Sequence, residues 1–401
     1  MSTQKFATQA LHAGHDTNKT GGTRAVPIYQ STAYVFDDSD DAAGRFNLSV
    51  PGFIYTRLNN PTNDILEQRL AALEGGIAAV ATASGTAAIS TTLLTLLKAG
   101  DHIVASSSLY GGTYNLLSVT LPRHGITTTF VDPSDPENFA KAAQENTRAI
   151  FVESLGNPKL DVLDIAAIST AAKAHKVPLI VDNTVATPYL LNPIEYGANI
   201  VIHSLTKYIN GNGTSLGGVV IDAAAFIAKI RIEGLRDYGG ALSPFNAFQI
   251  IQGLETLELR IQKHSENALE LAKWLQAQPE VKWVNYPGLE TSKYNVLAKK
   301  YLPKGQSGIV TFGADGGYDA AKTIADTTKL FSLLANIGDT KSLIIHPAST
   351  THQQLSDEAQ ETTGVTKDLI RLSVGIENIE DLKADLKEAF AVVKQKQALQ
   401  N

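Results

Sequence analysis

The sequence predicts an α/β protein in which a large, mostly parallel sheet is followed by a smaller C-terminal α+β domain. Seven short apolar runs alternate with longer helical segments between residues 79 and 221, and this alternation is typical of βαβ units. The runs are almost continuously apolar, as expected of strands that are buried on both faces of a sheet. After about residue 257 strands and helices follow in a different order, which favours a separate α+β domain.

Composition and charge narrow the function classes. The chain has 401 residues, of which 43% are hydrophobic and 18% charged, and a formal net charge of −6. This charge gives no positive surface for nucleic acid or an anionic membrane. No apolar run reaches the roughly 18 residues of a transmembrane helix, and the absence of cysteine excludes disulfides, thiolate catalysis and Cys-ligated zinc. We therefore expect a cytoplasmic enzyme with small-molecule substrates.

The N-terminal segment, residues 1–58, is expected to be an extended arm. Glycines and prolines interrupt any periodicity there, and such an arm usually needs another surface to lie on. A helix is predicted after Pro61, where Leu66, Leu70 and Leu73 recur at helical spacing, and Gly75 ends it.

The predicted sheet lies in a first domain, residues 59–257. Its strands are expected at Ala79–Ala83, His102–Ala105, Thr128–Val131, Ala149–Val152, Leu179–Val181, Ile200–Ile202 and Val219–Ile221. A helix over Ala87–Leu97 is expected to follow the first strand. Ligands of such sheets bind outside the carboxyl ends of the strands, so residues just past the strand ends are the candidates for function.

The second domain, residues 258–401, is predicted to be smaller. The expected elements are a helix over Leu254–Leu275, strands at Val281–Val284, Gly308–Phe312 and Leu369–Ser373, and a last helix in which Leu382, Leu386, Phe390 and Val393 share a face.

Lys207 is the most informative residue. Ser204, Thr206 and Lys207 follow the end of one predicted strand, and the preceding strand ends in Asp182. A lysine becomes a nucleophile only when its pKa falls from roughly 10.4 towards neutrality. A Schiff base with pyridoxal phosphate achieves this, and the cofactor's ring nitrogen then needs a carboxylate, the part that Asp182 would play. A solvated surface lysine would leave the polar residues at these strand ends unexplained.

A second pattern predicts a phosphate site. Ser84-Gly85-Thr86 stands where a strand turns into a helix. A helix N-terminus presents free N–H groups, and glycine lets a phosphate approach the backbone. By itself the pattern is typical of a helix cap. Together with Lys207 it predicts a phosphate-binding site.

Two other patterns are set aside. The loop Asn210–Gly218 has the wrong spacing for a dinucleotide fingerprint and precedes a strand instead of opening a helix. His346 and His352 lack metal-ligand spacing and an acidic companion, so no metal is assigned.

At these residues the sequence resembles the cystathionine γ-synthase-like family of pyridoxal-phosphate enzymes of cysteine and methionine metabolism, which has fold type I, like aspartate aminotransferase. Eight motifs in order carry the resemblance over nearly the whole chain: Tyr55-Thr-Arg57-Leu-Asn-Asn-Pro-Thr62, Leu73-Glu-Gly-Gly76, Ser84-Gly85-Thr86, Ser108-Leu-Tyr-Gly-Gly-Thr113, Glu153-Ser-Leu-Gly-Asn-Pro158, Val181-Asp-Asn-Thr184, His203-Ser-Leu-Thr-Lys207 and Arg371-Leu-Ser-Val-Gly375.

The resemblance implies roles around the cofactor. Lys207 would bind pyridoxal phosphate as the Schiff base, Asp182 would pair with the ring nitrogen, and Asn157 would bond the 3-hydroxyl oxygen. Tyr110 would stack on the ring and act as acid or base near the leaving group. The phosphate would be held by Gly85, Thr86, Ser204 and Thr206, with Ser84 at the same turn.

It also implies roles at the substrate end and between subunits. Arg371 would clamp the substrate carboxylate, because its planar fork suits a bidentate contact, and Asn336 would lie beside it. Tyr55 and Arg57 would reach the phosphate of a neighbouring subunit in a homotetramer built from two active dimers, with Tyr55 also near the substrate.

Several details resemble the O-acetylhomoserine sulfhydrylase branch of the family, namely Leu109–Asn115, Ala335–Asp339 and His346–His352. This branch implies γ-replacement on O-acetyl-L-homoserine by sulfide or a thiol, which gives L-homocysteine or methionine, and acetate.

Alternatives within the family stay open. They are a methionine γ-lyase-type γ-elimination, a cystathionine γ-synthase and an O-succinylhomoserine sulfhydrylase. The γ-lyases usually carry a cysteine where this chain has Thr113, which favours the transferase. One departure from the branch is that Val219–Asp222 runs straight into Ala223–Ala228, where an insertion is common. The shortened loop leaves the acyl group open.

Overall fold

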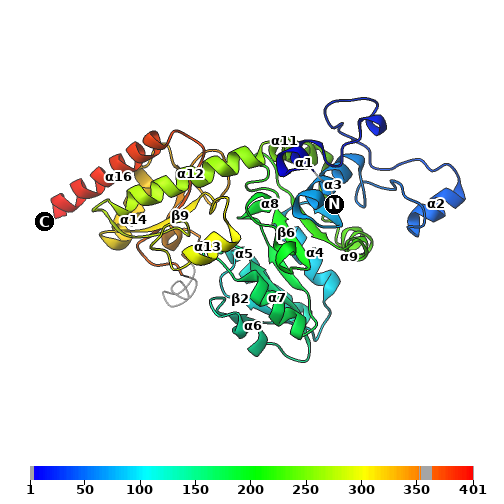
Figure 1. Cartoon of the computed structure of the whole chain (residues 1–401), viewed down its shortest axis with the longest axis horizontal. Coiled ribbons are helices and arrows are strands. Elements are labelled where there is room, and N and C mark those ends of the chain that lie inside the picture. Colours follow the sequence, from blue (N-terminus) through cyan, green and yellow to red (C-terminus); the bar gives the residue numbers. More distant parts are fainter. Residues whose placement is uncertain (1–3, 352, 354–363, 401) are drawn as a thin grey trace.

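The computed structural model describes residues 4–351, 353 and 364–400, and these residues form two sheets with their covering helices. The large sheet lies within residues 78–222 and the small one within residues 281–373. Helix α12 (Leu257–Gln276) runs from the first to the second (Figure 1). The predicted fold class is confirmed, whereas the domain limits at residues 58 and 257 stay a prediction.

The large sheet has seven strands in the order β1-β7-β6-β5-β4-β2-β3. Strand β7 is antiparallel to both of its neighbours, and all other pairs are parallel. Every predicted strand is present, with ends within two residues of the expected ones. The strands are β1 Ala78–Thr82, β2 His102–Ser106, β3 Thr127–Val131, β4 Thr147–Glu153, β5 Leu179–Asp182, β6 Ile200–Ser204 and β7 Gly218–Asp222.

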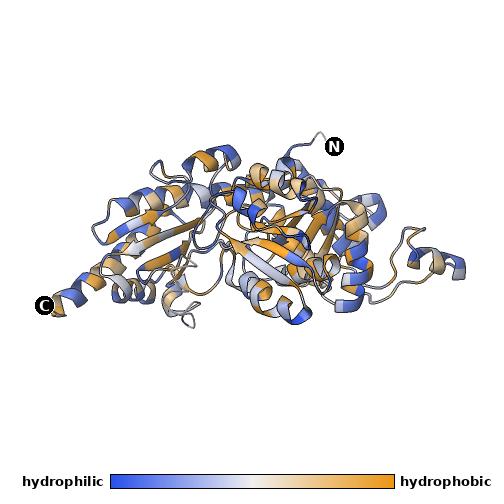
Figure 2. Cartoon of the chain, turned by 90° about the horizontal axis from the view of Figure 1, so that it is seen from below, coloured by the Kyte–Doolittle hydropathy of each residue, from blue (hydrophilic) through white to orange (hydrophobic). Residues whose placement is uncertain are grey.

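Helices cover both faces of this sheet. Successive side chains of a strand point to opposite faces, and on β5 Ile180 and Val181 accordingly belong to two separate buried clusters. One cluster includes α3 (Pro61–Glu74), α7 (Ile165–Ala174) and α11 (Pro244–Leu254); the other includes α4 (Gly85–Leu96) and the π-helical segment η5 (Ile230–Leu235). Figure 2 shows apolar residues concentrated on the strands, with hydrophilic residues on the outer helices.

The small sheet has the order β10-β11-β12-β9-β8. Its strands are β8 Val281–Asn285, β9 Ile309–Ala314, β10 Ser332–Leu333, β11 Leu343–Ile345 and β12 Leu369–Ser373. Helices α12, α14 (Gly317–Thr327) and α16 (Ile379–Gln400) share one buried cluster with it. The predicted apolar face of α16 is confirmed, because all four of its residues are buried in that cluster.

One expectation about helices was wrong. The N-terminal segment is not irregular throughout, since it contains α1 (Phe6–His12) and α2 (Ser39–Phe46). The long helix expected over Leu254–Leu275 is present as α12, which begins at Leu257 and ends at Gln276.

The remaining elements are short. The helices are α5 Gly111–Asn115, α6 Glu137–Lys141, α8 Thr187–Leu190, α9 Ala224–Lys229, α10 Arg236–Tyr238 and α13 Asn295–Tyr301, and the 3₁₀ and π segments are η1 Thr17–Thr20, η2 Leu116–Thr120, η3 Leu121–His124, η4 Pro193–Tyr196 and η6 Pro347–Ser349. Among the helices that the structure describes, none combines the length and the apolar character needed to cross a membrane.

Candidate active site

A cavity of about 260 Å³ lies between the two sheets. The large sheet contributes the carboxyl ends of β4, β5 and β6 and the N-terminus of α4. The small-sheet side contributes a strand of the sheet and the loop between β10 and β11. The lining residues are Ser84, Gly85, Thr86, Ile89, Tyr110, Thr113, Glu153, Leu155, Asn157, Asp182, Thr184, Val185, Ser204, Thr206, Lys207, Leu216, Ala335, Asn336, Ile337 and Arg371.

Lys207 points across this cavity from the loop after β6. Its Nζ donates a hydrogen bond of 2.6 Å to Oδ1 of Asn336. Burial, together with the positive charge of Arg371, lowers the pKa of Lys207 to about 8. A lysine in such surroundings carries a substantial fraction of neutral, nucleophilic amine near neutral pH.

Asp182 and Glu153 are Cα partners at the ends of the adjacent strands β5 and β4. Burial raises the pKa of Asp182, and two hydrogen bonds from Thr184 (N at 3.0 Å, Oγ1 at 2.5 Å) and the charge of His203 oppose the rise. Burial and the Asp182 charge raise the pKa of Glu153 well above its ordinary value. Asp182 is therefore the better anion of the pair, and Glu153 the better proton carrier.

The polar end of the cavity is formed by the N-terminus of α4. The Oγ of Ser84 caps the helix by accepting from the N–H of Ala87 at 3.0 Å, and helix geometry leaves the N–H groups of Gly85 and Thr86 without helical partners. A Cβ on Gly85 would come within 2.6 Å of the Cβ of Ser204, so only glycine lets α4 approach the end of β6 this closely. Ser204 and Thr206 line the same cavity.

Tyr110 stands at the cavity mouth and is 57% exposed. Its backbone N–H donates a hydrogen bond of 2.6 Å to Oε1 of Glu153, which fixes the start of α5. Thr113, on the same short helix, is buried against the cavity. A ring held here can cover one face of a planar ligand.

Arg371, on β12, faces the cavity from the small sheet. Its Nη1 donates to Oδ1 of Asn157 at 3.1 Å, and its Nη2 donates to the backbone oxygen of Asn336 at 3.1 Å. Burial lowers the pKa of Arg371 to about 10. Its Nε is buried and has no hydrogen-bond partner among the described residues. A buried cation with an unused donor is suited to an anionic ligand.

Tyr55 and Arg57 do not line the cavity. They lie on the segment that carries α2 away from the large sheet (Figure 1). The guanidinium of Arg57 lies 5.2 Å from the centroid of the Tyr55 ring. All the other residues given a role in the site by sequence line the one cavity.

A family model described as Cys/Met metabolism PLP-dependent enzyme matches residues 7–391. The chain belongs to the Cys/Met metabolism PLP-dependent enzyme family. It is 54% identical to the O-acetyl-L-homoserine sulfhydrylase of Leptospira meyeri, with 96% of each chain covered. It is 48% identical to the homocysteine synthase of Schizosaccharomyces pombe, with 98% of this chain and 99% of the relative covered.

Solved structures agree with this membership. A putative O-acetylhomoserine (thiol)-lyase of Campylobacter jejuni superimposes with a TM-score of 0.94 and 45% identity, covers 97% of this chain and 100% of its own, and carries N'-pyridoxyl-lysine-5'-monophosphate. The metB protein of Corynebacterium glutamicum gives a TM-score of 0.91 and 37% identity, with 98% and 99% covered.

The residues of the cavity fit the cofactor of a PLP-dependent family enzyme. Lys207 can hold its aldehyde carbon, the Asp182 carboxylate its ring nitrogen, and the N-terminus of α4 its phosphate, which are the three polar groups that the cofactor presents. The unused Nε of Arg371 is left for a further anion. No group of three or more His, Cys, Asp or Glu side chains within the described residues is arranged to hold a metal ion; His352 lies outside those residues.

Among the lining residues to which the sequence assigned no role, Glu153 and Thr184 are polar. Both stood inside quoted motifs. The usable signal for Glu153 was that β4, like β5, ends in a carboxylate at the sheet edge where ligands bind.

Proposed function

We propose that this enzyme catalyses γ-replacement on O-acetyl-L-homoserine. Sulfide, or a thiol, replaces the acetate at Cγ, and the products are L-homocysteine, or methionine, and acetate. The observation that carries the proposal is the convergence of Lys207, Asp182 and Arg371 on one cavity. The names of relatives that are 44–54% identical over nearly the whole chain support the choice of substrate.

Arg371 binds and orients the substrate carboxylate. Its side chain is already held by Asn157 and by the backbone of Asn336, so little conformational entropy is lost when the substrate arrives. This contact brings Cα of the substrate towards Lys207, whose Nζ is turned to the same side of the cavity by Asn336.

Lys207 moves the protons. Pyridoxal phosphate, when bound, supplies an electron sink for the negative charge that develops at Cα. The neutral amine of Lys207 removes the proton at Cα, gives it up to the bound cofactor and, neutral again, removes a proton at Cβ, so that acetate can leave Cγ. After sulfide has bonded to Cγ, Lys207 returns protons to Cβ and Cα. A lysine pKa of about 8 matches this work near neutral pH, because a general base is most effective when its pKa lies near the working pH.

Asp182 and Tyr110 complete the set. Asp182 supplies the anion that holds a proton on the cofactor's ring nitrogen. Tyr110 covers the ring and acts as acid or base near the leaving group, for which its place at the cavity mouth is suitable.

Tyr55 and Arg57 serve the site of a neighbouring subunit in a homotetramer built from two active dimers. The support is their place on the projecting N-terminal segment, where Val35 is 93% and Phe46 63% exposed. Large apolar side chains so exposed are expected to be covered by another surface. The cytoplasm stays our prediction for the location of the enzyme.

Product analysis tests the function. Purified, cofactor-loaded enzyme is given O-acetyl-L-homoserine with and without sulfide, and homocysteine, acetate and keto acid are quantified. We expect sulfide-dependent homocysteine and an equal amount of acetate, with little keto acid. If keto acid and ammonia form equally fast with and without sulfide, the enzyme catalyses γ-elimination and the proposal is overturned.

A parallel reaction with O-succinyl-L-homoserine tests the acyl group. Strand β7 leads directly into α9 with one intervening residue, so the shortened loop noted in the sequence is also short in the structure. Faster turnover of the succinyl ester than of the acetyl ester would favour an O-succinylhomoserine sulfhydrylase. Faster turnover with cysteine than with sulfide would favour a cystathionine γ-synthase.

A further inference from the structure

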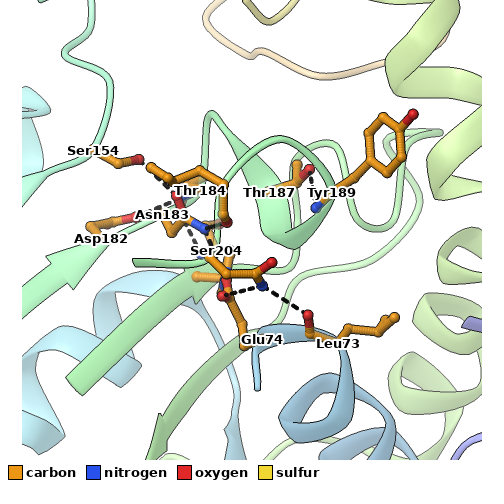
Figure 3. Close-up of polar contacts among 12 residues, drawn as sticks. Leu73, Glu74, Ser154, Asp182, Asn183, Thr184, Thr187, Tyr189 and Ser204 are labelled. Carbon is orange, nitrogen blue, oxygen red and sulfur yellow. Dashed lines mark hydrogen bonds and ion pairs between the residues drawn. The ribbon is translucent and has the colours of Figure 1, made fainter. Parts of the chain in front are cut away.

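A buried polar cluster lies next to the strand ends that form the cavity, and Figure 3 shows its members Glu74, Ser154 and Asn183. Each cavity residue at the end of β4, β5 or β6 has its chain neighbour in this cluster, and those neighbours are Ser154, Asn183 and His203. Side chains of consecutive residues in a strand point to opposite faces. The cluster is therefore connected to the cavity through the backbone of three strands.

Glu74, the last residue of α3, is the centre of the cluster. Its side chain is fully buried, and its Oε1 accepts hydrogen bonds from Nε2 of His203 at 2.5 Å and Nδ2 of Asn183 at 2.9 Å. Its Oε2 accepts from Nδ2 of Asn192 at 3.2 Å. Asn183 is held further by Ser154, whose Oγ donates to its Oδ1 at 2.8 Å. A buried carboxylate persists only when it is paired in this way.

His203 connects Glu74 to the cavity through its chain neighbour, Ser204. Because the carboxylate of Glu74 only accepts, Nε2 of His203 carries the proton of their hydrogen bond. The backbone N–H of Ser204 donates to Oγ1 of Thr184 at 2.8 Å, and that hydroxyl donates to Oδ1 of Asp182 at 2.5 Å. The other acidic group at this end of the sheet is Glu153 on β4, whose pKa is raised by burial and by the Asp182 charge.

The charged groups that face this region from the packed elements are few in the described residues. His203 meets Glu74 from α3 and Asp182 from β5, and on the cavity side Lys207 and Arg371 are nearest. Of these, Glu74 and His203 lie behind the strands, where neither lines the cavity.

We propose that Glu74 and His203 are positioning residues that keep the carboxylate of Asp182 aimed at the cofactor's ring nitrogen. Glu74 holds His203 and Asn183 by hydrogen bonds, so the ends of β5 and β6 are anchored from behind. The inference rests on the proposed placement of the cofactor and is independent of the identity of the substrate.

Glu74→Gln and His203→Gln test the pair. Glu74→Gln keeps the shape but has one acceptor oxygen in place of the two that hold the cluster, and His203→Gln keeps a donor towards Glu74 but loses the rigid imidazole ring. The readouts are the pH titration of the visible absorbance of cofactor attached to Lys207 and the cofactor dissociation constant. We expect both variants to raise the midpoint by about one pH unit and to weaken cofactor binding about tenfold.

The direction follows from the ring nitrogen. When the carboxylate of Asp182 is displaced, the ring nitrogen loses its proton more easily and withdraws fewer electrons from the bond to Lys207. The nitrogen of that bond becomes more basic, and the midpoint of the titration rises. A purely structural role of the cluster would lower the melting temperature and leave the midpoint unchanged.

Glu67→Gln is the matched control. Glu67 is a second buried carboxylate on α3; it accepts from the backbone N–H of Ala81 at 2.8 Å and from Arg231 at 2.6 Å, and it does not line the cavity. We expect Glu67→Gln to lower the melting temperature in a thermal melt. The midpoint of the absorbance titration should stay that of the wild type.

The outcomes separate two failures. Wild-type midpoints in Glu74→Gln and His203→Gln, or an equal shift in Glu67→Gln, would overturn the role of the pair; if Glu74→Gln does not fold, His203→Gln alone decides. A wild-type protein that takes up no cofactor would overturn the proposed function, and the inference with it.

Discussion

The two sides of the cavity are built differently. On the large-sheet side, Asp182, Ser204 and the N-terminus of α4 are placed by the backbone, because each stands at the end of a hydrogen-bonded strand or the start of a helix. On the small-sheet side, Arg371 comes from a strand but Asn336 comes from the loop between β10 and β11.

Side-chain hydrogen bonds connect the two sides. Lys207 donates to Asn336, and Arg371 donates to Asn157. With the roles proposed above, the side placed by the backbone holds the cofactor, and the side whose placement depends on individual side chains holds the substrate. Substitutions on the first side should change the cofactor's absorbance, and substitutions on the second should change the kinetics with the substrate.

The largest expected effect is that of Lys207→Ala. Turnover should fall by about 10³-fold or more, because the group that moves the protons is lost, while the cofactor should still bind without a covalent bond. Steady-state kinetics and the absorbance spectrum of the dialysed protein measure the two effects. Near-normal turnover of this variant without an added amine would break the assignment.

Arg371→Lys tests the other side. The variant keeps the charge but loses the planar fork, so one charge-assisted hydrogen bond to the substrate, about 1.5–3 kcal/mol, should be lost. We expect kcat/KM to fall roughly 10- to 100-fold, mainly through KM. The cofactor's absorbance should be that of the wild type. A changed spectrum with an unchanged KM would mean that Arg371 serves the cofactor and not the substrate.

A smaller effect is expected from Asn336→Ala. It removes the acceptor of the 2.6 Å hydrogen bond from Lys207, a contribution of about 1 kcal/mol, so kcat should fall by about five- to tenfold. Asn146→Ala is the matched control. Asn146 donates a hydrogen bond to the backbone oxygen of Gly100 at the amino ends of β2 and β4, whereas the cavity lies at the carboxyl ends of the strands. If the two variants have equal kcat values, the hydrogen bond across the cavity has no catalytic role.

The same division explains how much the sequence could predict. Buried parallel strands leave continuous apolar runs, so all seven strands and the polar residues after them were found. Asn336 and Arg371 were assigned only through the family resemblance, since nothing in the local pattern brings a loop so close to a lysine 129 positions away.

Short elements and long-range pairs were missed for related reasons. Strands β10 and β11 have two and three residues, which is too few for any periodicity to appear. Glu74 ends a helix just before a glycine, where a glutamate is usually solvated; only the fold brings it to His203, which is 129 positions away.

The smallest expected effect is a pH shift that joins the two sides. The pKa of Lys207, about 8, lies below its ordinary value because of burial and the charge of Arg371. Attachment of the cofactor to the apoprotein needs the neutral amine, so its rate should rise with pH and level off above pH 8. In Arg371→Gln the positive charge is gone, the pKa of Lys207 rises, and the midpoint should move upwards by less than about one unit. Stopped-flow absorbance over pH 6.5 to 10 measures both midpoints, and a downward or absent shift would mean that the charge on the small-sheet side does not reach the lysine.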